Sequence, residues 1–448
     1  MSVSPARAAA FDILLRVDQE DAYASELLHS ERCASLTAVD QGLTTELVMG
    51  VLRWRSALDE AIANVSSQNL ARLDPEVLTS LRLGAYQLGW LDRVPARAAI
   101  HESVELVKRA RKRSAAPFAN AILRKLAEKP AQGNARVQPL LSTADSEALA
   151  HTSAHPLWLV QRWTAQFGIE TTARTCAFNQ STPVTAIRLR EASAEEELRR
   201  EGIDVVPGSM LATARRVAAG DVTKTKAYRD GRVAIQDEAS QLVAALVGRG
   251  SRILDCCAAP GGKTWAIADR NPDAGIVAVE LHERRAQILR KRVPTPNVEV
   301  ITGDIRQLPV GDLFERVLVD APCSGTGTIA RNPEIKWRLR PEDLLDLRGR
   351  QLAILQAAAK HVAPGGALIY ATCSLEQEED ESVIEETLRA ESSLRLQDVR
   401  PELERLRSAE ELTASLSIKT LVKGSYLRTT PGVQPTDGFF AAILRREP

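Results

Sequence analysis

The chain has 448 residues, with 58 Lys and Arg against 58 Asp and Glu, 44% apolar residues and 26% charged residues. This length predicts two or three domains, and the composition is that of a folded protein, which excludes an intrinsically disordered chain. No apolar run approaches a membrane span and the first residues lack a signal-peptide cleavage pattern, so neither a membrane protein nor a secreted one is expected.

The cysteines point to a reducing compartment. Six cysteines occur, no two of them form a C-x-x-C pair, and no His stands at zinc-finger spacing. We therefore expect free thiols in the cytoplasm and no metal site.

The first 130 residues are expected to form an all-α domain. Asp74 and Pro75 supply an N-cap and a Pro at the first helical position, and apolar residues follow at helical spacing through 77–91. Similar apolar stripes occupy 43–62 and 100–107. These stripes predict helices that pack against one another in a single core.

The same domain has an uneven charge. Residues 1–92 contain 7 Lys and Arg against 13 Asp and Glu, whereas residues 93–130 contain 10 against 3. The densest basic stretch is KRARKR, at 108–113. Such a run is either the solvated face of a helix or a phosphate-binding patch for nucleic acid, and both interpretations stay open.

The rest of the chain predicts two further domains. A loose stretch from Lys129, KPAQGNARVQPLLSTAD, indicates a linker, and residues 131–235 then mix helical and strand-like runs, which suggests a small α+β module. In residues 236–448, the strand candidates RILD, IVAVE, VEVI, RVLVD and ALIYA alternate with helical stretches, and GFFAAIL comes last. This alternation predicts a Rossmann-like parallel sheet covered by helices on both faces.

A glycine-rich turn follows the first strand of the predicted sheet, at the edge where ligands of open α/β sheets bind. The turn is CCAAPGGKT, 256–264, and it leads into a helix, so backbone N–H groups can approach a ligand closely. Its last three residues match the end of a phosphate-binding P-loop. The first glycine of that motif would fall at Cys257, so the P-loop interpretation fails.

Two acids end the next two predicted strands. Glu280 suits a ribose with two free hydroxyls, and Asp304 is placed to accept from an adenine amino group. Either acid alone could equally be a helix cap, but together they outline a nucleoside site. A dinucleotide and S-adenosylmethionine both fit this pattern.

The fourth and fifth strands end in two cysteine motifs, DAPCSGTG at 320–327 and ATCS at 371–374. With CCAAPGGKT, these motifs resemble those of the RNA 5-methylcytosine methyltransferases, and among them the Sun/Fmu type, which modifies 16S ribosomal RNA. Four segments of the first domain resemble its NusB-like RNA-binding domain, namely ELVMGVLRWRSALD, LRLGAYQL, VPARAAIHESVELVKRA and FANAILRKL. The resemblance covers nearly the whole chain and is weakest over 131–230.

The resemblance implies a class I methyltransferase fold, S-adenosylmethionine as cofactor, and a hairpin or single-stranded loop of 16S rRNA as substrate. It also implies a set of cofactor-binding residues. These are Cys257, Ala258, Ala259, Pro260, Gly261, Gly262, Lys263, Glu280 at the ribose, Asp304 at the adenine and Asp320 near the methyl group. Relatives often have Asp where this chain has Glu280.

The resemblance further implies that Cys373 is the nucleophile, with Cys323 and Asp320 as the other catalytic residues. C5 of cytosine is a weak nucleophile, and addition of a thiolate to C6 activates it through a covalent intermediate. Cys323 would then assist removal of the C5 proton or release of the product, and Asp320 would donate to N3 or bind the exocyclic amine. The acidic residues 376–381 would oppose a thiolate, so we expect them to point outward.

A basic and aromatic cluster suited to single-stranded RNA follows the DAPC motif, although its tryptophan could equally be a core residue. The cluster consists of Arg331, Lys336, Trp337, Arg338 and Arg340. Two alternatives stay open: the same chemistry on tRNA or another rRNA position, and a non-catalytic RNA-binding or antitermination factor. The second alternative needs neither Cys323 nor Cys373.

Overall fold

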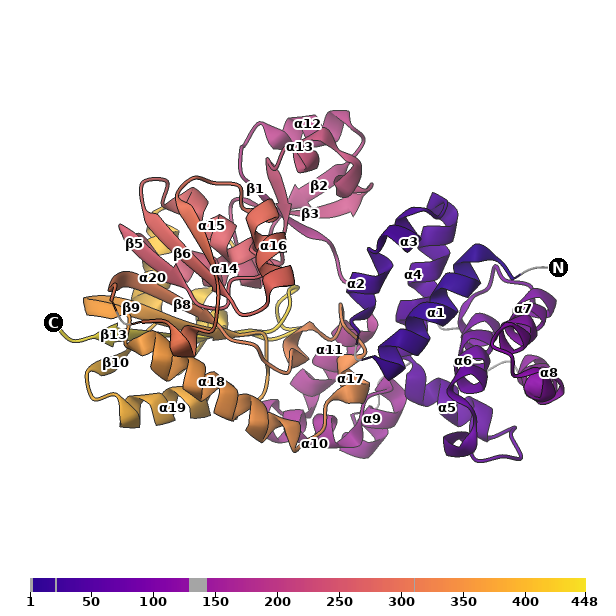
Figure 1. The fold of residues 1–448 in the computed structure, drawn as a ribbon. Helices are drawn as coiled ribbons and strands as arrows, with labels where there is room; N and C mark the ends of the chain where they lie inside the picture. Colours follow the sequence, from indigo (N-terminus) through magenta and orange to yellow (C-terminus); the bar gives the residue numbers. More distant parts are fainter. Residues whose placement is uncertain (1–2, 21, 129–142, 310) are drawn as a thin grey trace. The chain divides into compact units, whose positions relative to one another are not determined.

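The computed structural model describes residues 3–20, 22–128, 143–309 and 311–448 (Figure 1). The chain forms two compact units. The first comprises Met1–Thr182 together with Ile329–Arg338, and the second comprises Pro183–Thr328 with Leu339–Pro448. In the described residues, no helix is long and apolar enough to cross a membrane.

The first unit is helical, as the apolar spacing predicts. Its helices are α1 (Pro5–Gln19), α2 (Ala24–Leu28), α3 (Glu31–Ala34), α4 (Ala38–Arg53), α5 (Arg55–Ala63), α6 (Pro75–Trp90), α7 (Ala96–Arg109), α8 (Ala116–Glu128), α9 (Ser146–Ser153), α10 (Leu157–Phe167), α11 (Ile169–Gln180) and α17 (Ile335–Arg338). Pro75 opens α6, where its missing N–H leaves no intrahelical bond unmade. One apolar core joins α1, α4, α6, α7 and α8.

Helix α17 lies far along the sequence from the other helices of this unit and is buried among them. Lys336 is 1% exposed, and its Nζ donates to the carbonyl oxygens of Arg53 and Ala154, each at 2.9 Å. Burial lowers the pKa of Lys336 to about 7. The indole N–H of Trp337 donates to the carbonyl of Leu52 at 2.6 Å.

The expectation that this cluster contacts RNA is therefore wrong for Lys336, whose donors are used inside the unit. The composition of the segment shows that it is basic and aromatic, but only the tertiary structure decides which of its side chains are buried and which are exposed. The helix-capping carbonyls that Lys336 satisfies come from α4 and from the end of α9, both distant in sequence.

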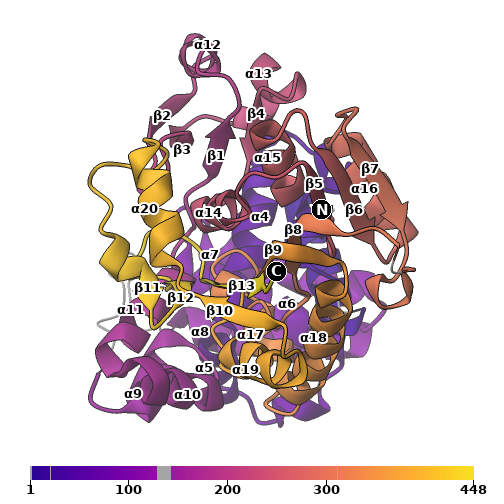
Figure 2. The ribbon, with the colours of Figure 1, turned by 90° about the vertical axis from the view of Figure 1, so that its left-hand side faces the viewer.

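The second unit begins with a small antiparallel sheet, in the order β2-β3-β1-β4 (Figure 2). Its elements are β1 (Ala186–Leu189), α12 (Ala194–Arg200), β2 (Asp204–Pro207), β3 (Ala214–Ala219), α13 (Lys226–Arg229) and β4 (Val233–Ile235). The predicted module 131–235 thus contributes helices to the first unit and strands to the second. Its predicted linker lies largely outside the described residues, and the domain boundaries at 130 and 235 stay a prediction.

A nine-stranded sheet forms the rest of the second unit, in the order β11-β12-β13-β9-β8-β5-β6-β7 with β10 beside β13. Its strands are β5 (Arg252–Asp255), β6 (Gly275–Glu280), β7 (Val298–Thr302), β8 (Phe314–Asp320), β9 (Val362–Thr372), β10 (Leu394–Gln397), β11 (Val422–Lys423), β12 (Tyr426–Thr429) and β13 (Phe439–Arg446). Strands β5 to β9 are mutually parallel, as predicted. The strands after β9 pair antiparallel, so the sheet is mixed.

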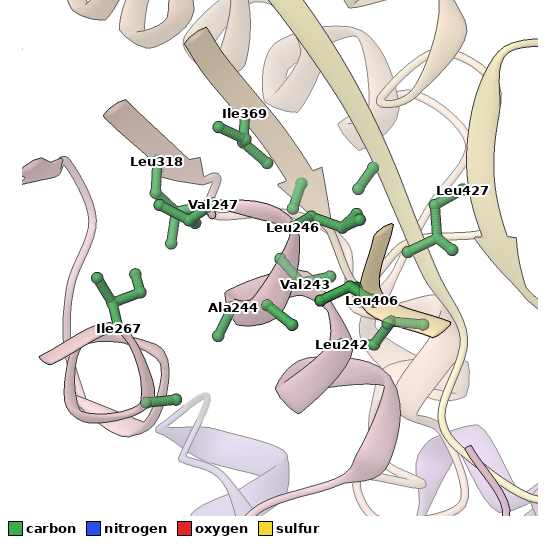
Figure 3. Close-up of a cluster of buried hydrophobic side chains, with 14 of the residues drawn as sticks. Leu242, Val243, Ala244, Leu246, Val247, Ile267, Leu318, Ile369, Leu406 and Leu427 are labelled. Atoms are coloured by element: carbon green, nitrogen blue, oxygen red, sulfur yellow. The ribbon is translucent and has the colours of Figure 1, made fainter. Parts of the chain in front are cut away.

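Helices cover both faces of this sheet, which confirms the expected layering. They are α14 (Glu238–Leu246), α15 (Gly262–Arg270), α16 (Glu283–Arg292), α18 (Asp343–Ala359), α19 (Glu381–Ala390) and α20 (Arg400–Ser408). Alternate residues of β9 enter different cores because side chains of a strand alternate between faces. Ile369 belongs to the same apolar core as Leu246 of α14 and Leu406 of α20 (Figure 3), whereas Leu368 belongs to a core with Leu355 of α18.

Candidate active site

The two predicted catalytic cysteines follow neighbouring parallel strands. Strand β8 ends at Asp320 and β9 ends at Thr372, and Asp320 lies opposite Ala371 in the register. The sulfur atoms of Cys323 and Cys373 are 3.4 Å apart, and both side chains are half-buried. The fold therefore brings two thiols that are 50 positions apart in the chain into one site.

The environment of the pair distinguishes the two thiols. The contact with Cys373 and the burial of the site raise the pKa of the Cys323 thiol well above its ordinary value, and the Glu379 carboxylate adds to the shift. The raised pKa favours the protonated form of Cys323, and at 3.4 Å either thiol can donate its S–H to the other sulfur.

An ion pair lies at the same edge of the sheet. The ammonium of Lys263 donates to Asp320 Oδ2 at 2.8 Å and lies 4.8 Å from the centre of the Phe439 ring. Burial disfavours the charged ammonium, but the attraction of Asp320 outweighs it, so the pKa of Lys263 lies above its ordinary value. The ammonium also interacts electrostatically with Cys373. The sequence motifs place Lys263 in the cofactor loop, and its side chain points to Asp320, which the resemblance assigned both to the cofactor and to catalysis.

The glycine-rich turn closely follows the backbone path that its sequence predicts. Gly261 has a φ of +102°, and a Cβ there would lie 2.7 Å from Leu289 Cδ1 and 2.9 Å from Val293 Cγ2. Only glycine tolerates both the positive φ and the lack of space for a Cβ. Helix α15 begins at the next residue, Gly262, so its first N–H groups face the end of the sheet.

Asp255, the last residue of β5, is a buried acid that the sequence motifs did not single out. One of its carboxylate oxygens accepts from the Thr264 hydroxyl at 2.7 Å. The other is buried and has no hydrogen-bond partner in the part of the chain that the structure describes. Burial raises the pKa of Asp255 to about 7, and the charge of Asp320 adds to this. An acid at the end of the first strand, just before a glycine-rich turn, is the signal that could have identified it.

The two acids expected at a nucleoside both make local contacts. Glu280 is 4% exposed and accepts from the backbone N–H of His282 at 3.0 Å. Asp304 accepts from the backbone N–H of Arg306 at 2.9 Å, and the guanidinium of Arg306 lowers its pKa. Both lie at the ends of neighbouring strands β6 and β7, and their roles at ribose and adenine stay predictions.

The expectation that the acidic residues 376–381 point outward is wrong. Glu376, Glu379 and Asp380 are each at most 1% exposed. Asp380 accepts from the Thr372 hydroxyl at 2.6 Å and from the Arg428 guanidinium at 3.0 Å. Their burial is possible because donors from other parts of the chain satisfy these carboxylates, and a run of acids in the sequence does not reveal such donors.

Glu379 connects the two cysteine loops. Its carboxylate accepts from the backbone N–H and the hydroxyl of Ser324, from the Ser374 hydroxyl at 2.5 Å and from Gln351 Nε2 at 2.8 Å. Ser324 follows Cys323, and Ser374 follows Cys373. The Glu379 carboxylate therefore joins the segment that carries Cys323 to the segment that carries Cys373 through hydrogen bonds.

Comparison with known proteins gives consistent matches over the whole chain. A family model described as 16S rRNA methyltransferase RsmB/F matches residues 246–445, and a NusB family model matches residues 4–128. The chain is 31% identical to the probable ribosomal RNA small subunit methyltransferase B of Bacillus subtilis, over 100% of both chains. It is 32% identical to the putative methyltransferase Rv1407 of Mycobacterium tuberculosis, over 99% of this chain and 97% of the relative.

Solved structures show the same fold. The crystal structure of PH0851 matches 100% of both chains with a TM-score of 0.80 at 22% identity. The structure of NSun6 from Pyrococcus horikoshii with SFG matches 64% of this chain and 97% of that protein, with a TM-score of 0.54 at 20% identity.

Proposed function

Because this chain belongs to the RsmB/F family of 16S rRNA methyltransferases, we propose that it methylates C5 of a cytosine in 16S rRNA through a covalent adduct on Cys373. The coarser activity, S-adenosylmethionine-dependent methylation of rRNA by a protein with an N-terminal NusB domain, follows from the family itself. The observation that carries the finer proposal is the 3.4 Å contact between the sulfurs of Cys323 and Cys373.

The residues at the glycine-rich turn fit the cofactor. Gly261 keeps the turn free of a side chain, and Asp255 offers a buried oxygen that lacks a partner among the described residues. We assign the backbone of 257–263, with Glu280 and Asp304, to binding S-adenosylmethionine, which supplies an electrophilic methyl group when bound.

The two thiols support a division of labour in the reaction. The thiolate of Cys373 forms a bond to C6, and the electrons of the C5–C6 double bond make C5 nucleophilic. Once its sulfur is bonded to carbon, Cys373 no longer provides the contact that contributes most to the raised pKa of Cys323. C5 then gains the methyl group, and S-adenosylhomocysteine leaves. Cys323 can lose its proton to solvent and, as a thiolate, take the proton from C5. The electrons of that C–H bond restore the C5–C6 double bond as the bond between C6 and the Cys373 sulfur breaks.

The Lys263–Asp320 pair orients the target base in this proposal. Asp320 Oδ2 is engaged by the ammonium at 2.8 Å, which leaves Oδ1 to accept a hydrogen from the exocyclic amine of cytosine. Of the two roles considered for Asp320, this one suits an ion-paired carboxylate, because donation to N3 would require the protonated acid. The base must leave its stack to reach the site, so a loop or a single strand is the favoured substrate.

Bisulfite mapping of 16S rRNA tests the proposed function. RNA from cells with and without this protein should differ at one cytosine, and the purified protein should restore the methyl group on RNA that lacks it. Methylation found on a nitrogen, or on a tRNA and not on 16S rRNA, would contradict the proposal.

Glu379→Gln should slow methyl transfer by about tenfold to a hundredfold, because an amide has one acceptor oxygen for four donors and leaves buried donors unpaired. Loss of the negative charge should also lower the pKa of Cys323. Iodoacetamide labelling of Cys323, followed by mass spectrometry against pH, should therefore show its midpoint at lower pH than in the wild type.

Glu385→Gln is the matched control for this change, since Glu385 is an exposed carboxylate of α19 whose ion-pair partner among the described residues is Arg389. The control should leave both the rate and the labelling midpoint unchanged. An unchanged midpoint in Glu379→Gln would show that Glu379 does not act on Cys323.

The basic stretch of the first unit should contribute to rRNA affinity. Arg111 and Arg113 are exposed and have no ion pair among the described residues. Arg111→Ala/Arg113→Ala should weaken rRNA binding and reduce the slope of log K against log salt by about 0.7 to 0.9 per lost phosphate contact. Binding of S-adenosylmethionine, measured by calorimetry, should not change.

Point substitutions suit this question better than deletion of residues 1–130, because that deletion would uncover the buried Lys336. Arg16→Ala/Arg32→Ala is the control, since both arginines are exposed and already paired with acids. An equal loss of affinity in the control would mean that the effect depends only on net charge.

A further inference from the structure

The second unit contains a recess that the proposed reaction does not use. It has a volume of about 550 Å³ and is bounded by α13 and β4 of the small sheet on one side and by α15 and α16 on the other. Of the residues assigned to the cofactor or to catalysis, only Gly262 lines it. The recess is therefore a surface distinct from the cysteine site.

The wall of the recess is strongly basic. Helix α16 contains five basic residues against the single acid Glu283. Arg229, Lys291 and Arg292 line the recess and are exposed, and none has a carboxylate partner in the described ranges. The acid that lines it, Asp230, is already paired with Lys226 and Arg232. The recess thus presents uncompensated positive charge.

Apolar side chains also line the recess. Ile235 is 44% exposed and Ile288 is 49% exposed, although both are large aliphatic side chains. Tyr228 and Trp265 line the same space; Trp265 is only 9% exposed, and the guanidinium of Arg190 lies 4.2 Å from its ring centre, so Tyr228 is the aromatic side chain open to a base. Aliphatic and aromatic faces among cations match the chemistry of a single strand of nucleic acid, which offers flat bases and phosphates alternately.

The recess also adjoins the reactive groups. Gly262 lines it, and the next residue, Lys263, donates to Asp320 at 2.8 Å. A strand lying in the recess would reach Gly262, whose neighbour in the chain, Lys263, belongs to the pair that orients the target base. The cations are on α13 and α16, two elements of the same unit, so they need no rearrangement to act together.

We propose that this recess binds a single-stranded stretch of the rRNA substrate next to the target nucleotide, with phosphates on Arg229, Lys291 and Arg292 and a base on Tyr228. The proposal rests on rRNA being the substrate and is independent of which atom is methylated. It takes the place of Lys336, which the sequence suggested for this task and which the first unit buries.

The test measures binding of the full-length protein to a single-stranded RNA of roughly 12 nucleotides, within the range of single-stranded sites. Lys291→Ala/Arg292→Ala should weaken binding by at least tenfold and reduce the slope of log K against log salt by about 1.4, or 0.7 for each lost phosphate contact. Tyr228→Ala should weaken binding by roughly ten- to a hundredfold with the slope unchanged, because stacking carries no charge. In both variants of the recess, KM for 16S rRNA should rise while the affinity for S-adenosylmethionine and the melting temperature stay at wild-type values.

Lys360→Ala/Lys419→Ala is the matched control, since it removes two exposed lysines of the same unit that do not line the recess. Equal weakening in the control, or unchanged affinity in both Lys291→Ala/Arg292→Ala and Tyr228→Ala, would overturn the proposal. This test and the test of C5 methylation can fail independently. An enzyme that methylates another atom could still lose RNA affinity when the recess residues are changed. Conversely, if the protein methylates C5 but these variants bind RNA as the wild type does, only the proposed RNA-binding role of the recess is wrong.

Discussion

Cys373→Ala should abolish methyl transfer to 16S rRNA while leaving the binding of S-adenosylmethionine nearly intact. The substitution removes the thiolate that forms the bond to C6, and the neighbouring thiol, Cys323, is assigned to the C5 proton and not to C6. Loss of a nucleophile costs roughly 10⁴-fold or more in kcat. The cofactor contacts assigned to 257–263 belong to other elements of the sheet and should be unaffected.

Transfer of tritium from labelled cofactor to rRNA measures the first effect, and calorimetric titration with the cofactor measures the second. Cys33→Ala is the control, because Cys33 is a buried thiol of the first unit with no place in the site. Substantial activity in Cys373→Ala would refute the assignment of the nucleophile.

Cys323→Ala should have the opposite signature and trap RNA on the protein. Cys373 can still add to C6, and C5 can still gain its methyl group, because neither step requires the second thiol. Removal of the C5 proton then lacks its base, so the bond between C6 and sulfur persists. The adduct should survive denaturing gel electrophoresis as a slowly migrating band that contains both protein and RNA.

The band should vanish in Cys323→Ala/Cys373→Ala, which has no nucleophile to form the bond. An adduct in Cys373→Ala and none in Cys323→Ala would mean that the roles of the two thiols are exchanged. The wild-type protein is the reference for turnover, since it should release the methylated RNA and show little of the band.

Much of the fold could be predicted because its signals are local. Apolar spacing along 77–91 places α6, and the alternation of short apolar runs with helical stretches places β5 to β9. The turn at Gly261 is also local, since its positive φ and the closeness of α16 both demand a residue without a side chain. Strand direction is not local: the antiparallel pairing of β13 with β9 depends on the path of the connecting chain, and an apolar run carries no sign of it.

The active site likewise combines features that depend on local sequence with features that depend on contacts between distant residues. The sequence by itself determined that Cys323 and Cys373 stand just beyond strand ends, because each belongs to a short motif after an apolar run. Only the tertiary structure decided that Lys263 turns to Asp320, that Glu379 is buried under both cysteine loops, and that Lys336 enters the first unit. In each case the charge is stabilised by a partner from a distant part of the chain. A buried charge is tolerated only with such a partner, and the packing of the folded chain, rather than the neighbouring sequence, supplies it.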